Sequence, residues 1–277
     1  PAAVNEGDGT NTVTFTVTLS NASTLPVTVA YTTADGTAKA GIGLDYESQS
    51  GILTFAAGET AKTITVAIRD DTVYEGPESF TVALSSPTNS VILDGSGIAT
   101  IMDDGTGTLV DPTPNDPPPA PDDDRPHVAS VSNAIAPEGS PLDFTVTLSN
   151  ASTSVTTVTL TLKDGSANIT SDTPQQLLVS FDNGTSYTTT TGILSGTGIS
   201  VSVPAGITSF LVRVPTSDDA VYEGSETLSL QAATPLDTAP VTGIGTITDV
   251  ADLPKISIND PAAVNEGDGT NTVTFTV

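Results

Sequence analysis

Hydrophobic and polar residues alternate in short runs along most of the chain. In the first run, Val13, Phe15, Val17 and Leu19 are separated by threonines, so one face of an extended segment is apolar. This period-two pattern is typical of β-strands with one buried face, and turn-forming sequences separate the runs. The sequence therefore predicts two packed antiparallel sheets. The other positions expected to face the core are Val27, Val29, Tyr31, Leu53, Phe55, Ile64, Val66, Ile68, Phe80, Val82, Leu84, Ile98 and Ile101.

The second half of the chain repeats the first in diverged form. FTVTLSNAST occurs at 15–24 and again at 144–153, and VYEGPES at 73–79 is echoed by VYEGSET at 221–227. We therefore expect an all-β protein of tandem antiparallel β-sandwich domains, with no helix. The predicted parts are a first domain at 1–104, a linker at 105–126, a second domain at 127–252 with an insertion near 173–200, and the start of a further domain at 253–277.

The predicted linker and the end of the chain are distinctive. Residues 105–126 are rich in proline and aspartate without alternation, which predicts an extended, semi-rigid spacer. The sequence PAAVNEGDGTNTVTFTV occurs unchanged at 1–17 and 261–277, which indicates one unit of a longer array. Residues 255–258 are expected to form the first strand of the next domain, a strand that the first domain lacks. We therefore expect identical neighbouring repeats as partners, and strand exchange through 255–277.

Composition excludes several classes of function. The chain carries 33 acidic against 7 basic residues, a formal charge of −26, so it would repel nucleic acid. Cysteine is absent, which excludes disulfides and thiolate metal sites. No apolar stretch reaches the length of a membrane helix, so direct membrane insertion is not expected. His127 is the sole histidine, and aromatic residues are scarce, so we expect no enzyme activity.

The carboxylates cluster at predicted strand ends. In the first domain they follow strands or sit in the loops between them, and alternate loops of a sandwich meet at one tip. The spacing DD-x-V-x-E-x-x-E occurs at 70–78 and again at 218–226, which random surface acidity does not explain. Many carboxylates in a small volume repel one another unless a cation compensates, and flexible oxygen ligands favour Ca²⁺. The sequence therefore predicts calcium sites at the sandwich tips.

These motifs make the first domain resemble the Calx-beta domain. NEG, DGTAxxGxxxDY, AGE, a strand ending in IxDD with EGxESF beyond it, and a second IxDD occur in the order of that family. The resemblance implies an Ig-like sandwich with calcium bound at one tip by loop carboxylates and one backbone carbonyl. The implied ligands are Glu6, Asp45, Asp70, Asp71, the carbonyl of Val73, Glu75, Glu78, Asp103 and Asp104.

The second domain resembles the family less well. Its DY motif is absent, so Asp172 is only an approximate counterpart of Asp45, and Val250 stands in place of Asp104. Fewer ions or weaker binding are expected there. The implied ligands are Glu138, Asp172, Asp218, Asp219, the carbonyl of Val221, Glu223, Glu226, Asp249 and Asp252.

The resemblance and the exact repeat together indicate a mechanical function. We expect a calcium-stiffened extender of a repetitive bacterial adhesin at the cell surface, similar to the extender repeats of RTX-type adhesins. Three alternatives remain. One is a regulatory calcium sensor of the kind found in membrane transporters, and another is direct binding of carbohydrate or protein through the loops. The third is general acidity that adapts the protein to salt, in which case NaCl would replace CaCl₂.

Overall fold

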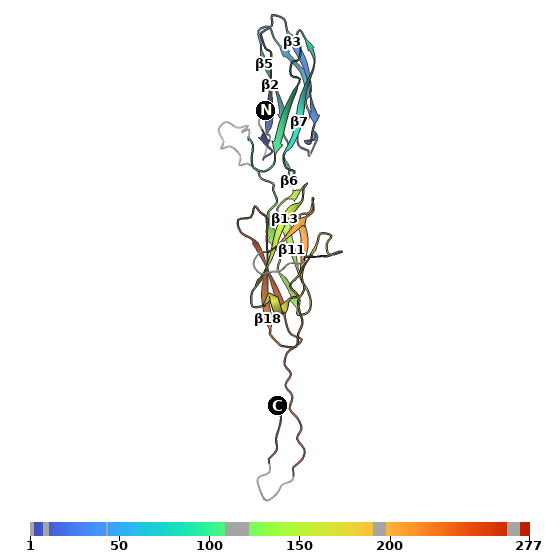
Figure 1. Ribbon diagram of the computed structural model, residues 1–277, viewed down its shortest axis with the longest axis vertical. Helices are drawn as coiled ribbons and strands as arrows, with labels where there is room; N and C mark the ends of the chain where they lie inside the picture. The colour runs from blue at the N-terminus through green and yellow to red at the C-terminus, as the bar shows by residue number, and fades with distance from the viewer. Residues whose placement is uncertain (1–2, 8–10, 43, 109–121, 191–197, 265–271) are drawn as a thin grey trace.

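The structure is a computed structural model that describes residues 3–7, 11–42, 44–108, 122–190, 198–264 and 272–277. Figure 1 shows two β-sandwiches stacked end to end, with the C-terminal segment leaving the far end of the second. Strands make up nearly all the regular structure, so the predicted fold class of tandem β-sandwiches is confirmed. Among the described residues, no helix has both the length and the apolar character needed to cross a lipid bilayer.

The first domain consists of a five-stranded sheet packed on a strand pair. In spatial order the large sheet is β1 (Val4–Asn5), β8 (Ser96–Met102), β7 (Glu78–Thr88), β3 (Val27–Asp35) and β4 (Ser50–Phe55). The facing pair is β2 (Thr12–Thr18) and β5 (Ala61–Ala67), and the short β6 (Val73–Tyr74) lies at the junction with the second domain.

The second domain has two five-stranded sheets. One is, in spatial order, β10 (Ala134–Pro137), β19 (Val241–Thr248), β18 (Ser225–Ala233), β13 (Thr156–Asp164) and β16 (Ile199–Val203). The other is β15 (Thr188–Thr190), β14 (Leu177–Ser180), β17 (Ser209–Val214), β11 (Leu142–Leu148) and β9 (Val128–Val131). β14 and β15 form an antiparallel hairpin inside the predicted insertion.

The core of the first domain follows the period-two pattern with one exception. Tyr46 stacks on Phe80 with ring centroids 4.1 Å apart, and Phe15 meets the same ring edge-on at 6.0 Å. Ile98, however, is 59% exposed, whereas Ile101 is buried. The prediction that both face the core is wrong, because residues three apart in a strand point to opposite faces.

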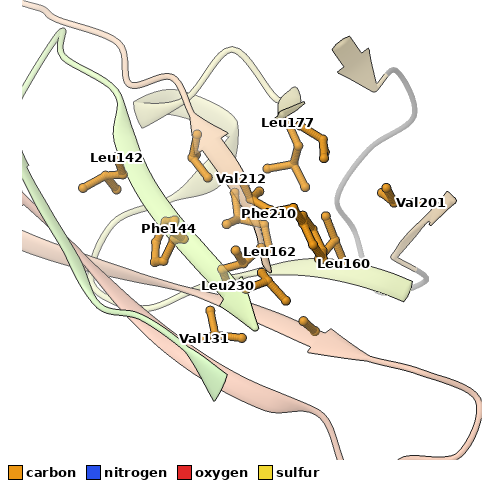
Figure 2. Packing of buried hydrophobic residues seen from close by; sticks show 14 of the residues in the cluster. Val131, Leu142, Phe144, Leu160, Leu162, Leu177, Val201, Phe210, Val212 and Leu230 are labelled. Carbon is orange, nitrogen blue, oxygen red and sulfur yellow. The ribbon is translucent and has the colours of Figure 1, made fainter. Parts of the chain in front are cut away.

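The core of the second domain is larger and matches the predicted alternation throughout. Phe144 and Leu142 on β11 face Leu160 and Leu162 on β13, as Figure 2 shows, and all four are 0% exposed. Because the longer strands contribute alternate apolar residues from their inner faces, the sheets can pack at the density typical of protein interiors.

Two local features differ from the sequence-based expectation. β1 pairs with β8, and β10 with β19, in parallel, so each otherwise antiparallel sandwich has one parallel edge. A single helical turn, α1 (Ile169–Asp172), occurs where no helix was predicted. The Asn168 side chain accepts a hydrogen bond from Thr170 N–H at its start, and such capping supports a turn too short to be recognised by periodicity.

The domains contact each other directly. β6 pairs in parallel with β12 (Ala151–Ser152) of the second domain, and Thr153 N–H donates to the Tyr74 carbonyl at 2.9 Å. The carboxylate loops at this end of the first domain therefore lie beside the second domain.

The described ends of the predicted linker also lie on this tip. Thr108 N–H donates to the Ala3 carbonyl at 3.3 Å, and Asp124 is 7% exposed. Hydrogen bonds and burial thus hold these ends at the junction, and the extended spacer over 105–126 stays a prediction. Residues 109–121 lie outside the described residues.

Residues 255–258, predicted as the first strand of a further domain, form no strand. Ile256 is 87% exposed and Ile258 is 61% exposed. A strand needs a neighbouring edge for its backbone hydrogen bonds, and these residues have no strand beside them in the described part of the chain.

Candidate metal centre

Loops from distant parts of the first domain bring carboxylates together at its junction end. Glu6 follows β1, Asp45 lies in the loop before β4, and Asp103 follows β8. All three are buried, with exposed fractions of 9%, 7% and 3%. Side-chain oxygens of Asp45, Glu75 and Glu78 lie within 4.8 Å of one another. The sandwich topology thus joins residues about 30 to 100 positions apart in the sequence.

Backbone hydrogen bonds fix the orientation of these carboxylates. Asp45 Oδ2 accepts from Lys39 N–H at 2.6 Å, and Asp103 Oδ2 accepts from Glu75 N–H at 2.9 Å. Asp71 Oδ1 accepts from Val73 N–H at 2.7 Å. Because only one oxygen of each group is used in these bonds, the other oxygen remains available to a ligand.

The electrostatics of the cluster disfavour its charged form. Burial raises the pKa of Glu6 to about 9, and Asp103 and Asp71 add like-charge repulsion. Burial also raises the pKa of Asp103 to about 7. The pKa values of Glu75 and Glu78 are raised by burial and by Asp45. A divalent cation reverses both causes, because it replaces lost hydration and offsets the repulsion.

The structure adds carboxylates that the sequence interpretation missed. Asp124 from the linker lies near Asp70 and Asp71, and burial followed by the charge of Asp122 raises its pKa to about 6. Asn150 Nδ2 of the second domain donates to Asp124 Oδ1 at 2.5 Å. The run DDD at 122–124 was interpreted as self-repelling linker charge. The signal available in the sequence was the position of this acidic run, directly before the predicted start of the second domain.

Two predicted ligands of the first domain have other partners. Asp104 Oδ1 accepts from Thr106 N–H at 3.0 Å, and its charge acts on Arg125. Val73 pairs with Ala151 across the junction, so its carbonyl as a ligand stays a prediction.

The second domain brings nearly the same set together at its far end. Three groups have oxygens within 4.8 Å, and Glu138 and Glu223 each belong to two of them. The groups are Glu138 with Asp218 and Asp252, Glu138 with Asp219 and Glu223, and Asp172 with Glu223 and Glu226.

The hydrogen bonds of this second tip reproduce those of the first. Asp172 Oδ2 accepts from Asn168 N–H at 2.6 Å, as Asp45 does from Lys39. Asp249 Oδ2 accepts from Glu223 N–H at 2.7 Å. Asp172 reaches this position through helix α1, which replaces the longer loop of the first domain.

The remaining predicted positions in the second domain follow the first in part. Asp219 Oδ1 accepts from Val221 N–H at 2.7 Å, which repeats the turn at Asp71. The Val221 carbonyl stays a prediction. Asp252 N–H donates to Asp249 Oδ1 at 3.4 Å, so Asp252 enters the cluster from the loop after β19.

Like-charge repulsion also acts at the second tip. Burial and then Asp249 raise the pKa of Glu138, and burial and then Asp172 raise the pKa values of Glu223 and Glu226. Both tips therefore offer oxygen donors only, with carboxylates held closer than their repulsion favours. Such a donor set suits a hard divalent cation.

Comparison with known proteins places these clusters in a family. The family model described as the Calx-beta domain matches residues 1–105 and 195–261. Sodium/calcium exchanger 1 of Bos taurus is 42% identical over 81 residues, which is 27% of this chain and 8% of the exchanger. Human sodium/calcium exchanger 3 is 48% identical over 61 residues, 22% of this chain and 6% of that protein. The chain thus spans less than a tenth of these relatives.

Solved structures include similar chains. The calcium binding domain CBD12 of CALX1.1 has a TM-score of 0.35 at 15% identity, covering 85% of this chain and 79% of that one. The apo form of the Calx CBD1 domain has a TM-score of 0.30 at 28% identity, covering 37% and 88%. The family match extends over most of this chain and includes the tip loops of the first domain, and the chain belongs to the Calx-beta domain family.

Proposed function

We propose that this chain is a calcium-binding extender module of a repetitive bacterial cell-surface adhesin, stiffened by Ca²⁺ at its sandwich tips. The single observation that carries the calcium assignment is the clustering of all-oxygen donors at the same end of both domains. Calcium takes six to eight oxygens in flexible geometry, which matches loop carboxylates better than the strict octahedron of Mg²⁺ does.

The residues that would hold the ion in the first domain are those with a free carboxylate oxygen at the tip. Glu6, Asp45 and Asp103 are buried there, and Glu75 and Glu78 complete the group. A bound cation supplies the positive charge that these groups lack. Because it binds the folded state, it adds stability that grows with its concentration.

Because the first tip lies at the junction, calcium bound there would also limit bending between the two domains. Asp124 lies between the tip carboxylates and Asn150 of the second domain, and β6 beside the tip pairs with β12. Ordering of the tip loops therefore orders the surface on which the second domain stands. Each ion-filled junction would limit bending of the chain.

The exact repeat supports a role in extension. Residues 261–277 begin a further copy of the first domain, so the unit can follow itself end to end. A string of such units at a cell surface would hold a ligand-binding tip at a distance. Extracellular calcium is millimolar, and modules of this setting bind with Kd values of about 10⁻⁴–10⁻³ M.

Thermal unfolding in EDTA, CaCl₂, MgCl₂ and matched NaCl tests the proposal. We expect a large upward shift with CaCl₂ that NaCl does not reproduce. Asp70→Asn/Asp71→Asn removes the shift of the first domain, and the matched pair Asp218→Asn/Asp219→Asn removes that of the second. A melting temperature indifferent to calcium overturns the metal assignment, and an equal shift in NaCl favours general salt adaptation.

The similarity to sodium/calcium exchangers favours a second candidate, a regulatory calcium sensor. Affinity separates the two, because sensors respond at about 10⁻⁷–10⁻⁵ M calcium. Calorimetric titration with a Kd in that range supports the sensor, and a Kd near the extracellular concentration supports the extender.

A further inference from the structure

The two domains bring corresponding aspartates to their tips with different loops. Asp45 belongs to the segment DGTAKAGIGLDY, whereas Asp172 ends the helical turn α1 in the segment DGSANITSDT. The two loops differ in length, so a common spacing does not place these aspartates. The contacts that hold them are nevertheless the same, and they begin at Asp35 and Asp164, which are not among the predicted ligands.

Asp35 and Asp164 end strands β3 and β13 and hold the backbone of each loop. Asp35 Oδ1 accepts from Ala40 N–H at 3.1 Å, and Asp164 Oδ1 accepts from Ile169 N–H at 2.9 Å. In both domains the N–H of the residue before this donor bonds to the carboxylate of the predicted ligand. Two successive peptide groups are thus held by two carboxylates, of which only one is a predicted ligand.

A buried hydroxyl holds each loop from its other end, and in both domains it comes from the residue directly after the ligand aspartate. Tyr46 is 1% exposed, and its hydroxyl donates to Asp35 Oδ1 at 2.7 Å. Thr173 is 3% exposed, and its hydroxyl donates to the Ile169 carbonyl at 2.7 Å. Each ligand therefore lies between two hydrogen-bonded anchors, which restrict the movement of its backbone.

The backbone carbonyl of each ligand aspartate is anchored as well. Arg69 N–H donates to the Asp45 carbonyl at 2.9 Å, and Ser217 N–H donates to the Asp172 carbonyl at 2.8 Å. Both donors directly precede the paired aspartates of the DD-x-V-x-E-x-x-E motif. These bonds tie each loop to the segment that carries further predicted ligands.

The start of each loop is fixed on a strand that carries another predicted ligand. Ala38 N–H donates to the Ser79 carbonyl, and Ala167 N–H donates to the Thr227 carbonyl, each at 3.0 Å. A Cβ on the glycine two residues earlier would lie 2.3 Å from the same carbonyl oxygen in either domain, so only glycine permits this approach. Each of these carbonyls belongs to the residue after a predicted ligand glutamate.

We propose that Asp35 and Asp164 are positioning residues for Asp45 and Asp172, and that they raise the affinity of each tip for calcium by holding the ligand loop in one geometry before the ion binds. This inference rests on the proposed calcium function and deepens it. A loop that is already ordered loses less conformational freedom when the ion binds, so more of the interaction energy appears as affinity.

The hydrogen bonds of Asp35 are of the stronger kind. The hydroxyl of Tyr46 lowers the pKa of Asp35, so this acceptor is ionised at neutral pH. Hydrogen bonds to an ionised acceptor are about twice as strong as those between neutral groups. A negative charge close to a cation site also raises affinity without any positioning, and the test therefore separates charge from hydrogen bonding.

Calorimetric titration with CaCl₂ tests the first domain in chains that also carry Asp218→Asn/Asp219→Asn, so that the second tip does not contribute. Asp35→Ala removes the charge and both hydrogen bonds, whereas Asp35→Asn removes the charge and keeps the acceptor oxygen. Tyr46→Phe removes the hydroxyl and keeps the ring that stacks on Phe80. We expect Asp35→Ala and Tyr46→Phe to raise the Kd about tenfold, and Asp35→Asn to restore most of the affinity.

Asp94→Ala provides the matched control in the first domain. Asp94 accepts from Ser96 N–H in the loop between β7 and β8, at the end of the domain away from the tip. This substitution should leave the Kd unchanged. Equal losses from Asp35→Ala and Asp35→Asn would mean that charge alone acts. A lower melting temperature in EDTA with an unchanged Kd for Tyr46→Phe would assign a merely structural role, and either result overturns the proposal.

The second domain offers an independent repetition of this test. In chains carrying Asp70→Asn/Asp71→Asn, Asp164→Ala removes the corresponding carboxylate, and Thr173→Val removes the hydroxyl with little change of volume. We expect both to raise the Kd of the second tip, and Asp164→Asn to restore it. An unchanged Kd in both variants would contradict the positioning role in this domain.

Hydrogen exchange in EDTA tests the positioning without any metal. Asp35→Ala removes the acceptor of Ala40 N–H, so faster exchange of that amide follows directly. The proposal also requires Lys39 N–H to exchange at least about tenfold faster, because its acceptor is the carboxylate of Asp45. Acceleration at Ala40 alone would show that Asp35 does not hold Asp45.

The two proposals fail in different ways. Calcium binding by the unaltered chain, with the same Kd in all variants, would remove the positioning role and leave the calcium function intact. An unaltered chain that binds no calcium would overturn both.

Discussion

The two sandwich tips carry nearly the same carboxylates in different surroundings. At the first tip, Glu6 and Asp103 are buried, linker aspartates join the cluster, and the second domain stands on it. At the second tip Asp249 is likewise buried, but Glu138 is only partly buried. Burial raises the pKa of Glu6 to about 9, and burial followed by the charge of Asp249 raises the pKa of Glu138. The neighbouring structure, more than the ligand motif, sets how deeply the tip carboxylates are buried.

The largest expected difference between the tips is in calcium-dependent stability. Asp45→Asn/Asp103→Asn removes charge from the first tip, and Asp172→Asn/Asp249→Asn is the matched change at the second. The first pair should lose the roughly 3 kcal/mol that a ligand at 100 times its Kd adds. The second pair should lose less. Differential scanning calorimetry in EDTA and in CaCl₂ measures both, and equal losses would show that burial does not distinguish the tips.

The next comparison concerns Leu148, which is buried beneath β9, and the matching Leu19 of the first domain, which is partly buried. Leu148→Ala leaves a cavity beneath β9 and should cost about 3 kcal/mol of unfolding free energy. Leu19→Ala, at the matching position, should cost about 1 kcal/mol, because a partly exposed side chain loses less buried apolar area. Urea denaturation measures both. Similar costs would mean that Leu19 is as well covered in solution as Leu148.

The stability of the first domain should depend on pH, because burial and like-charge repulsion raise the pKa values of its tip carboxylates. In EDTA, the raised pKa values of Glu6 and Asp103 mean that their protonated forms favour the folded state. Their contribution to stability is full below the ordinary carboxyl pKa of about 4.5 and is lost as the pH rises through about 7 to 9. The melting temperature of the first domain should therefore fall between about pH 5 and pH 9.

Calcium provides the control for this titration. Because the cation binds the ionised carboxylates, saturating CaCl₂ should reverse or flatten the slope, while the second domain changes less. A melting temperature in EDTA that rises over the same interval would contradict the assignment of the raised pKa values.

The smallest effect on stability is expected at the junction. Asn150→Ala removes the hydrogen bond to Asp124 and should change the melting temperature little. It should instead broaden the distribution of overall dimensions measured by small-angle X-ray scattering in CaCl₂. Asn21, at the same position of the first domain and exposed, provides the control Asn21→Ala. Identical scattering from both variants would show that the Asn150–Asp124 hydrogen bond does not limit bending between the domains.

The sequence alone determined the strands and the ligand motifs. Alternation predicted the core faces of both domains, because a pleated strand directs successive side chains to opposite sides. It was wrong at Ile98, where the period was broken. Spacing identified the carboxylates at the strand ends, and the resemblance gave Asp172 as a counterpart of Asp45, which the shared hydrogen-bond pattern supports.

Only the tertiary structure decided how these parts meet. The hydrogen bond between Asp124 and Asn150 and the pairing of β6 with β12 both depend on where the second domain stands. Local patterns record which face of a strand is apolar, whereas contacts between distant segments depend on packing, and a single sequence carries no direct signal of that packing.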